Sequence, residues 1–197
     1  HAAVFLPTRV ERLRQEAPGV TLRTVRTTED SLRDAMAAGG VDLAIGPLPQ
    51  LQAGFFQRRL FSQRYVCLFR QGHPLDHDGF SLADVQAAEH LVVESAGTGH
   101  GQVDALIRRA GLQRSVRLTV PHFVGVGHLL QRTDLVATVT ERLADSLCGP
   151  FALTRRPHPL DLPEVAINVF WHTRVHRSPA DQWLRGVVLD LFGAGEG

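Results

Sequence analysis

His122 and Phe123 are the first residues of this chain whose types and positions favour small-molecule binding. They follow Pro121, at the point where the pattern predicts that one strand stops and a helix begins. An imidazole at the positive end of a helix dipole, beside an aromatic ring, suits a small aromatic or carboxylate ligand. The ring supplies apolar contact and the imidazole a hydrogen bond or a charge. The same two residues also fit the packed start of a helix that binds nothing.

His158 and Thr28 are further candidates for ligand contact. His158 stands between Pro157 and Pro159, where the chain is predicted to cross between two parts of the fold. An exposed turn is the alternative interpretation of that position. Thr28 ends a predicted strand and opens a helix, so its hydroxyl can either cap the helix or face a ligand.

Three other patterns point to chemistry less clearly. Residues 97–101 (Gly-Thr-Gly-His-Gly) precede a helix as phosphate-binding loops do, but they lack the P-loop lysine, and we interpret them as a flexible cap. His172 and His176 have the spacing of zinc ligands, without the glutamate or the helix of a zinc motif. Ser95 lacks the glycine-flanked turn of a hydrolase nucleophile. We therefore expect no enzyme, no catalytic residue, no metal and no cofactor.

The elements that must position these residues alternate between helix and strand. Strands separated by helices imply parallel sheets covered on both faces, which is an α/β fold. We expect helices over 4–13, 28–38, 102–110, 122–132 and 140–147, a short one opened by Ser81 and a last one opened by Ser178, and strands over 20–25, 41–46, 55–61, 65–70, 90–94, 115–120, 134–139, 151–155 and 165–171.

Two crossings, near 71–75 and 156–164, would divide the chain into two lobes with a cleft between them. Lobe I would comprise residues 1–73 and 160–197, and lobe II residues 74–159. Ligands of open α/β folds bind at the carboxyl ends of strands. This rule places Pro47, at the end of the strand over 41–46, and His122 near the cleft.

The bulk composition is that of an ordinary globular protein. The chain has 197 residues, 44% of them apolar and 21% charged, with a net charge of +1. Arginines are spread along the chain rather than clustered, so there is no nucleic-acid footprint, and no window is long and apolar enough to span a membrane. Cys67 lies in an apolar strand far from Cys148, which favours reduced thiols and a cytoplasmic location.

A series of landmarks runs in order along nearly the whole chain. They are Ala17-Pro18-Gly19-Val20-Thr21-Leu22, Gly40-Val41-Asp42-Leu43-Ala44-Ile45-Gly46, Tyr65-Val66-Cys67, Gly72-His73-Pro74-Leu75, residues 133–139, Phe170-Trp171-His172 and residues 178–185. Together these landmarks resemble the effector-binding domain of LysR-type transcriptional regulators. The last of them, together with residues 120–123, resembles the branch that includes nodulation regulators and sensors of salicylate or nitroaromatic compounds.

The resemblance implies a type 2 periplasmic-binding-protein-like fold, with two Rossmann-like lobes joined by two crossover strands. It implies a small effector, in this branch often an aromatic acid, bound between the lobes, with His1 and Ala2 following the loop that holds the effector through a Ser or Thr in the family. It also implies a homodimer through this domain, a homotetramer of the full-length protein, and DNA contact only through an N-terminal winged helix-turn-helix, which we expect to be absent from these residues. By position, the effector would contact Thr28, Pro47, Leu48, His122, Phe123, His158 and Phe170.

Two other classes of protein fit the same architecture. A periplasmic-type solute-binding protein of a transporter shares the bilobal scaffold, and an enzyme on that scaffold would need a catalytic set that the sequence does not display. The upstream part of the gene would separate the first two, because a helix-turn-helix indicates regulation and a signal peptide indicates transport.

Overall fold

The computed structural model of this chain describes residues 17, 19–25, 29–94 and 101–193, which fall into two compact units. Unit 1 contains residues 63–164, and unit 2 contains the described residues up to Ser62 together with those from Val165 onward. The lobe II expected from the sequence, 74–159, lies inside unit 1. Unit 1 begins earlier because the strand Tyr65–Arg70 pairs with two strands of its sheet.

Unit 1 is built on a five-stranded sheet with the strand order β5-β4-β6-β3-β7. β4 pairs in parallel with β5 and β6, whereas β3 runs antiparallel to both β6 and β7. The expectation of purely parallel sheets is therefore wrong: β3 enters the unit directly from the preceding strand and is inserted in the opposite direction. The strands are β3 (Tyr65–Arg70), β4 (Glu89–Val93), β5 (Ser115–Val120), β6 (Leu135–Thr140) and β7 (Leu153–Pro157).

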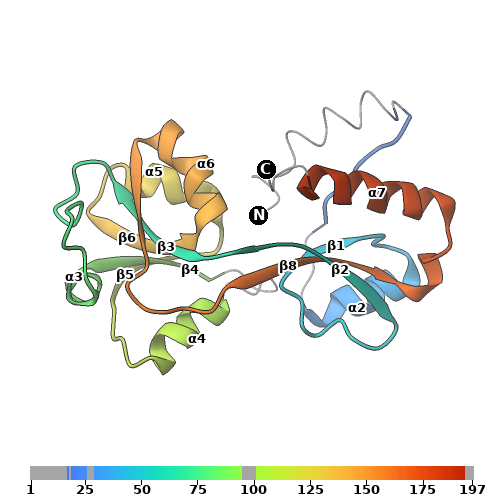
Figure 1. The fold of residues 1–197 in the computed structure, drawn as a ribbon, viewed down its shortest axis with the longest axis horizontal. Coiled ribbons are helices and arrows are strands. Elements are labelled where there is room, and N and C mark those ends of the chain that lie inside the picture. Colours follow the sequence, from blue (N-terminus) through green and yellow to red (C-terminus); the bar gives the residue numbers. More distant parts are fainter. Residues whose placement is uncertain (1–16, 18, 26–28, 95–100, 194–197) are drawn as a thin grey trace. The chain divides into compact units, whose positions relative to one another are not determined.

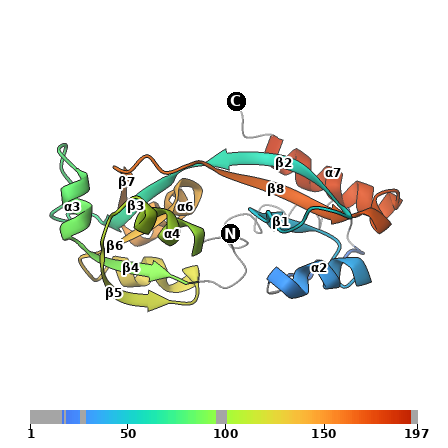
Figure 2. The same cartoon turned by 90° about the horizontal axis from the view of Figure 1, so that it is seen from below.

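Helices cover both faces of this sheet (Figures 1 and 2). On one side lie α5 (Val126–Leu130), preceded by the 3-10 turn η1 (Phe123–Gly125), and α6 (Glu141–Phe151). On the other side lie α3 (Leu82–Ala87) and α4 (Gly101–Arg109). The apolar run expected over 122–132 is thus a turn followed by a short helix.

The two faces of the sheet carry different side chains. Paired residues of neighbouring strands point to the same face, and successive residues of a strand alternate between faces. One set, here called the apolar face, contains Val66, Leu68, Leu91, Ala137 and Val139. The other set, here called the polar face, contains Tyr65, Cys67, His90, Thr138 and Thr140.

Unit 2 is built on a three-stranded sheet in the order β1-β8-β2, with β1 antiparallel to β8. Its strands are β1 (Ala44–Gly46), β2 (Phe55–Gln63) and β8 (Val165–His172), and its helices are α2 (Glu29–Ala38) and α7 (Pro179–Gly193), which follows the 3-10 turn η2 (Thr173–Val175). One core cluster, beside α2, contains Leu32, Met36, Ala44, Leu48, Leu51 and Phe170. The other, beside α7, contains Phe61, Ile167, Val169, Trp171, Val188 and Phe192.

Local signals in the sequence account for several helix ends. Gly39 has a φ of +81°, its N–H donates to the Met36 carbonyl and the Gly40 N–H donates to the Ala35 carbonyl, which is the glycine-based stop of a Schellman motif. The α3 helix begins with a capping box in which the Ser81 N–H donates to the Asp84 carboxylate at 2.8 Å. Both ends were predicted from these residue types.

The strand expected over 20–25 is not formed, and that prediction is wrong. These residues are exposed and have no regular secondary structure. Alternation of apolar and polar residues allows a strand, but a strand also needs a neighbour, and none of the ladders formed by the described residues includes this segment. The helix expected over 4–13 and the glycine-rich residues 97–100 lie outside the described residues.

Candidate functional site

The candidate site in unit 1 is a cavity at the carboxyl ends of β4 and β6. Ligands of open α/β sheets bind at these ends of the strands. Its volume is about 10 Å³. The lining residues come from the sheet, from α4 and from the segment after β5: Leu91, Val92, Val93, Val103, Asp104, Arg114, Phe123 and Thr138. Phe123, expected from the sequence at a ligand site, is thus placed on a cavity.

A buried ion pair forms the charged wall of this cavity. Arg114 Nη2 donates to Asp104 Oδ1, and the two side chains are only 6% and 11% exposed. The pair lies over the polar face, where burial and then the charge of Asp104 raise the pKa of Tyr65 to about 12. Opposite charges that are both removed from water depend on each other, because either one alone would be buried without compensation.

Besides two histidines, three polar side chains of unit 1 carry buried atoms without a hydrogen-bond partner among the described residues. They are the hydroxyls of Thr138 and Thr140 on β6 and both amide atoms of Gln63. Gln63 is only 1% exposed and stands where the chain passes from unit 2 into unit 1. Buried polar groups in native proteins nearly always have a partner, so these atoms are positions at which a bound molecule can supply one.

The imidazoles of His90 and His158 in unit 1 are held in defined tautomers. His90 Nε2 lies 2.7 Å from the Val85 carbonyl, so Nε2 carries the proton and donates, which leaves Nδ1 as an acceptor. His158 Nδ1 accepts from the Leu160 N–H at 3.1 Å, which leaves the proton on Nε2. The remaining nitrogens, His90 Nδ1 and His158 Nε2, are both buried and have no partner among the described residues.

Burial keeps both imidazoles neutral. It lowers the pKa of His158 to about 4, with further lowering by the charge of Arg114, and it also lowers the pKa of His90. His158 therefore offers a ligand a neutral N–H rather than the positive charge that the sequence allowed. Its place between two prolines is half-buried and not an exposed turn.

His122 and Phe123 lie side by side but in different environments. His122 is exposed and occupies the N-cap of η1, and its side chain makes no capping hydrogen bond. Phe123 is half-buried and lines the cavity. The strand does stop and a helical turn does start at this point, as predicted, although the turn is a single 3-10 turn.

The candidates from the other lobe belong to unit 2 and have mainly core positions. Leu48 is 6% exposed and Phe170 is 1% exposed, and both pack in the cluster beside α2. Pro47 is half-buried directly after β1. Thr28 lies outside the described residues, as do His1 and Ala2.

His172 and His176 have structural contacts in unit 2. His172 Nδ1 accepts from the Arg174 N–H at 3.2 Å, and His176 Nδ1 accepts from Trp171 Nε1 at 3.1 Å. Among the described residues, no group of three histidine, cysteine or acidic side chains is placed to hold a metal ion. The same described part of the chain holds no helix long and apolar enough to cross a bilayer.

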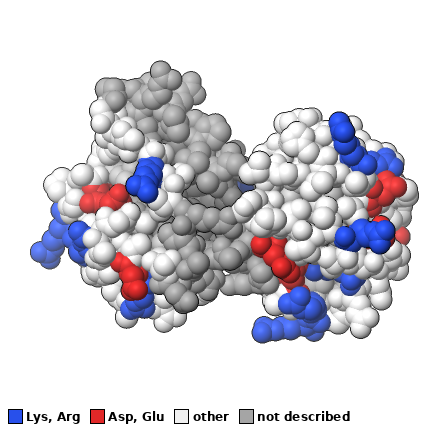
Figure 3. All heavy atoms as spheres, turned by 180° about the vertical axis from the view of Figure 1, so that it is seen from behind, with Lys and Arg blue, Asp and Glu red and all other residues white. Residues whose placement is uncertain are grey.

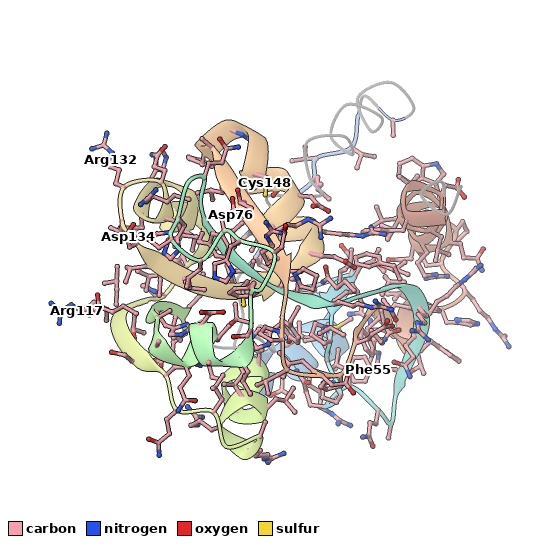
Figure 4. The ribbon with its side chains drawn as sticks, turned by 60° about the vertical axis from the view of Figure 1, so that its left-hand side comes forward. Phe55, Asp76, Arg117, Arg132, Asp134 and Cys148 are labelled. Atoms are coloured by element: carbon pink, nitrogen blue, oxygen red, sulfur yellow. The ribbon has the colours of Figure 1, made fainter. Side chains whose placement is uncertain are left out.

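Charged side chains on the surface are mixed in sign. On the face shown in Figure 3, basic groups lie next to acidic ones on each unit. Arg70 Nε donates to Asp134 at 2.7 Å and Arg155 Nε contacts Asp145 at 2.6 Å. Asp134, Arg132 and Arg117 all lie at the periphery of unit 1 in Figure 4. This face of the molecule therefore does not present a continuous basic patch.

The residues that sequence analysis missed are Gln63, His90, Asp104, Arg114, Thr138 and Thr140. The sequence positions of these residues allow more than one interpretation. Thr138 and Thr140 interrupt an otherwise apolar strand, and Arg114 follows a helix among exposed neighbours. Only the pairing of β6 with β3 and β4 shows that both threonines share one face with His90.

Two α/β units, each with its own sheet and joined by two crossings of the chain, define the class of type 2 periplasmic-binding-protein-like domains. Within this class, the chain belongs to the family described as the LysR substrate binding domain, whose model matches residues 1–193. The resemblance and fold class predicted from the sequence are thereby confirmed.

Two curated relatives are named as HTH-type transcriptional activators. The chain is 50% identical over 188 residues to the HTH-type transcriptional activator NahR of Pseudomonas putida, covering 95% of this chain and 63% of the relative. It is 48% identical over 188 residues to the HTH-type transcriptional activator NagR of a Ralstonia species, covering 95% of this chain and 62% of the relative. The chain therefore spans about three fifths of the length of these proteins.

Solved structures agree with this assignment. The regulatory domain of MexT, a transcriptional activator in Pseudomonas aeruginosa, is 28% identical, with a TM-score of 0.82 and coverage of 95% of this chain and 93% of that domain. The probable transcriptional regulator PA0477 of the same organism is 31% identical, with a TM-score of 0.83 and coverage of 98% of this chain and 63% of that protein.

Proposed function

We propose that this chain is the effector-sensing part of a LysR-type transcriptional regulator and that its effector is a small aromatic acid or a related ring compound. The observation that carries the proposal is the 50% identity, over 95% of the chain, to a protein named as a transcriptional activator. The family model also covers both units. These relatives favour regulation over the solute-binding and enzyme alternatives, since they are named as transcriptional regulators.

The residues available for effector binding support a ligand with a ring and a polar group. Phe123 offers an aromatic ring next to the exposed imidazole of His122. Gln63, Thr140 and His158 offer neutral donors and acceptors in the same unit. We propose these residues, with Thr28, Pro47, Leu48 and Phe170 from the rest of the chain, as the effector-contact set.

The effector acts by favouring one arrangement of the protein over another. A ligand shifts such an equilibrium only by the difference between its affinities for the two states, and a useful switch needs roughly 2–5 kcal/mol of that difference. We propose that the domain forms a homodimer, that the full-length protein forms a homotetramer in the cytoplasm, and that DNA is contacted only by a helix-turn-helix outside these residues.

Calorimetric titration of the chain with benzoate, salicylate and 4-nitrobenzoate tests the proposal. We expect at least one of these acids to bind, and a ligand at 100 times its Kd adds about 2.7 kcal/mol to the free energy of unfolding. Phe123→Ala should weaken binding by about tenfold, equivalent to about 1.4 kcal/mol. His122→Ala should weaken it as well.

Val124→Ala is the matched control, because Val124 is the neighbour of Phe123 and is 80% exposed. It should leave the Kd unchanged. Equal affinities of the wild type, Phe123→Ala and His122→Ala would remove both residues from the site. Failure of all three acids to bind or to raise the Tm would contradict the proposed effector class.

A further inference from the structure

The polar face of unit 1 borders a small cavity in which a hydroxyl lacks a hydrogen-bond partner among the described residues. The cavity beside β4, β6 and α4 has a volume of about 10 Å³. That is room for about one water molecule and too little for an organic ligand. The cavity therefore selects the smallest polar occupant.

The walls of this space include groups that can bind water. The Thr138 hydroxyl is buried and has no partner among the described residues. The Asp104 carboxylate and the Arg114 guanidinium line the same cavity. A carboxylate has about four acceptor sites and a guanidinium five N–H donors, so each can serve a water in addition to its partner.

Another atom of the polar face also lacks a hydrogen-bond partner among the described residues, although its side chain does not line the cavity. It is His90 Nδ1, a buried acceptor. A hydroxyl and an imidazole acceptor thus share this face with the buried ion pair. Dry cavities in proteins are apolar, whereas polar ones of this size hold ordered water.

We infer that an ordered water molecule occupies this cavity, hydrogen-bonded to the Thr138 hydroxyl and to the Asp104–Arg114 pair. The water links Thr138 of β6 to Asp104 of α4. This hydration site is a property of unit 1 and does not depend on the effector, so it stands or falls separately from the proposed function.

The number of long-lived internal waters, measured on the 197-residue chain by ¹⁷O magnetic relaxation dispersion, tests the inference. Thr138→Val keeps the shape of the side chain and removes the hydroxyl, and we expect it to hold one long-lived water fewer than the wild type. Thr138→Ser keeps the hydroxyl and should retain that water. Thr119→Val removes an exposed hydroxyl from β5 and should change nothing.

An equal number of long-lived waters in the wild type and in folded Thr138→Val would overturn the inference. If Thr138→Val does not fold, a crystal structure of the wild type that resolves individual waters decides instead. A water peak within hydrogen-bond distance of Thr138 Oγ1 supports the site. A dry cavity, or a Thr138 hydroxyl that donates to a protein carbonyl, overturns it.

Discussion

The two faces of the five-stranded sheet in unit 1 are made by the same strands and differ in almost everything else. On the apolar face, Leu68 and Ala137 are almost completely buried. On the polar face, His90 and Thr140 are equally buried, yet each has an atom without a partner. Burial by itself therefore does not identify a core residue that serves only stability.

This difference indicates which face of the sheet can bind a water or a ligand. A face covered by apolar side chains needs no hydrogen-bond partner, because burial of apolar surface is favourable without directional interactions. A face with unpaired polar atoms costs free energy until a water or a ligand completes it. Binding and stability are thus separated onto opposite sides of one sheet, and four substitutions or titrations test that separation.

The largest effect should come from breaking the ion pair on the polar face. Asp104→Ala leaves the Arg114 charge buried without compensation and should lower the free energy of unfolding by about 3–5 kcal/mol. Glu164→Ala breaks an exposed pair, in which Arg64 Nε lies 3.0 Å from Glu164 Oε1, and should cost less than about 1 kcal/mol. Urea unfolding measures both, and equal losses would show that the buried pair has no special role.

The second largest effect should come from lowering the pH, which reduces the free energy of unfolding through His158. The pKa of His158 falls from about 6.5 in the unfolded chain to about 4 in the folded one, so the unfolded state binds more protons between these values. The contribution of His158 to the free energy of unfolding is fully present above about pH 6.5 and is lost as the pH falls towards 4, by about 3 kcal/mol. His90, whose pKa is also lowered, adds to the loss in the same direction.

His158→Asn tests the source of this pH dependence. Its side chain cannot titrate, so its stability should fall less steeply between pH 6.5 and 4 than that of the wild type. Val124→Asn, which changes an exposed side chain that does not titrate, is the control and should follow the wild-type curve. The assignment fails if His158→Asn and the wild type lose stability in parallel in urea titrations across this range.

The next effect concerns packing between α5 and α6, the helices on the opposite side of the sheet from α3 and α4. A Cβ added at Gly127 of α5 would meet the ring of Phe151 at 2.4–2.7 Å, so Gly127→Ala should cost about 1–3 kcal/mol. Gly149→Ala in α6 meets nothing within 4 Å and should be neutral or slightly stabilising. Thermal unfolding of the two variants gives the comparison, and a harmless Gly127→Ala would mean that this interface is loosely packed.

The smallest effect should come from removing an unused hydroxyl. Thr140 is 1% exposed and occupies the N-cap of α6, where its side chain makes no capping hydrogen bond. Thr140→Val therefore loses no capping hydrogen bond and should change stability by less than about 1 kcal/mol in either direction. A loss above about 2 kcal/mol in the free energy of unfolding, measured in urea, would show that this hydroxyl has a hydrogen-bond partner in the folded protein.

Local rules in the sequence predicted the helix ends, and long-range pairing decided the rest. Gly39 and Ser81 act within a few residues of themselves, so their roles could be predicted from neighbouring residue types. The direction of β3 and the fate of residues 20–25 depend on which strands are available to pair, which no local pattern contains. The same limit applies to Gln63 and Thr140, because an unmet hydrogen bond becomes visible only when the surroundings are known.

The origin of the middle strand in unit 2 has a consequence for synthesis of the protein. β8 lies between β1 and β2, yet it is made from residues near the end of the chain. On the ribosome, unit 1 becomes complete at residue 164, while β1 and β2 wait for the strand that joins them. At about 5–20 residues per second that wait lasts roughly 5–20 s after β2 appears. We therefore expect unit 1 to fold before unit 2, although β1 and β2 of unit 2 are synthesised before unit 1.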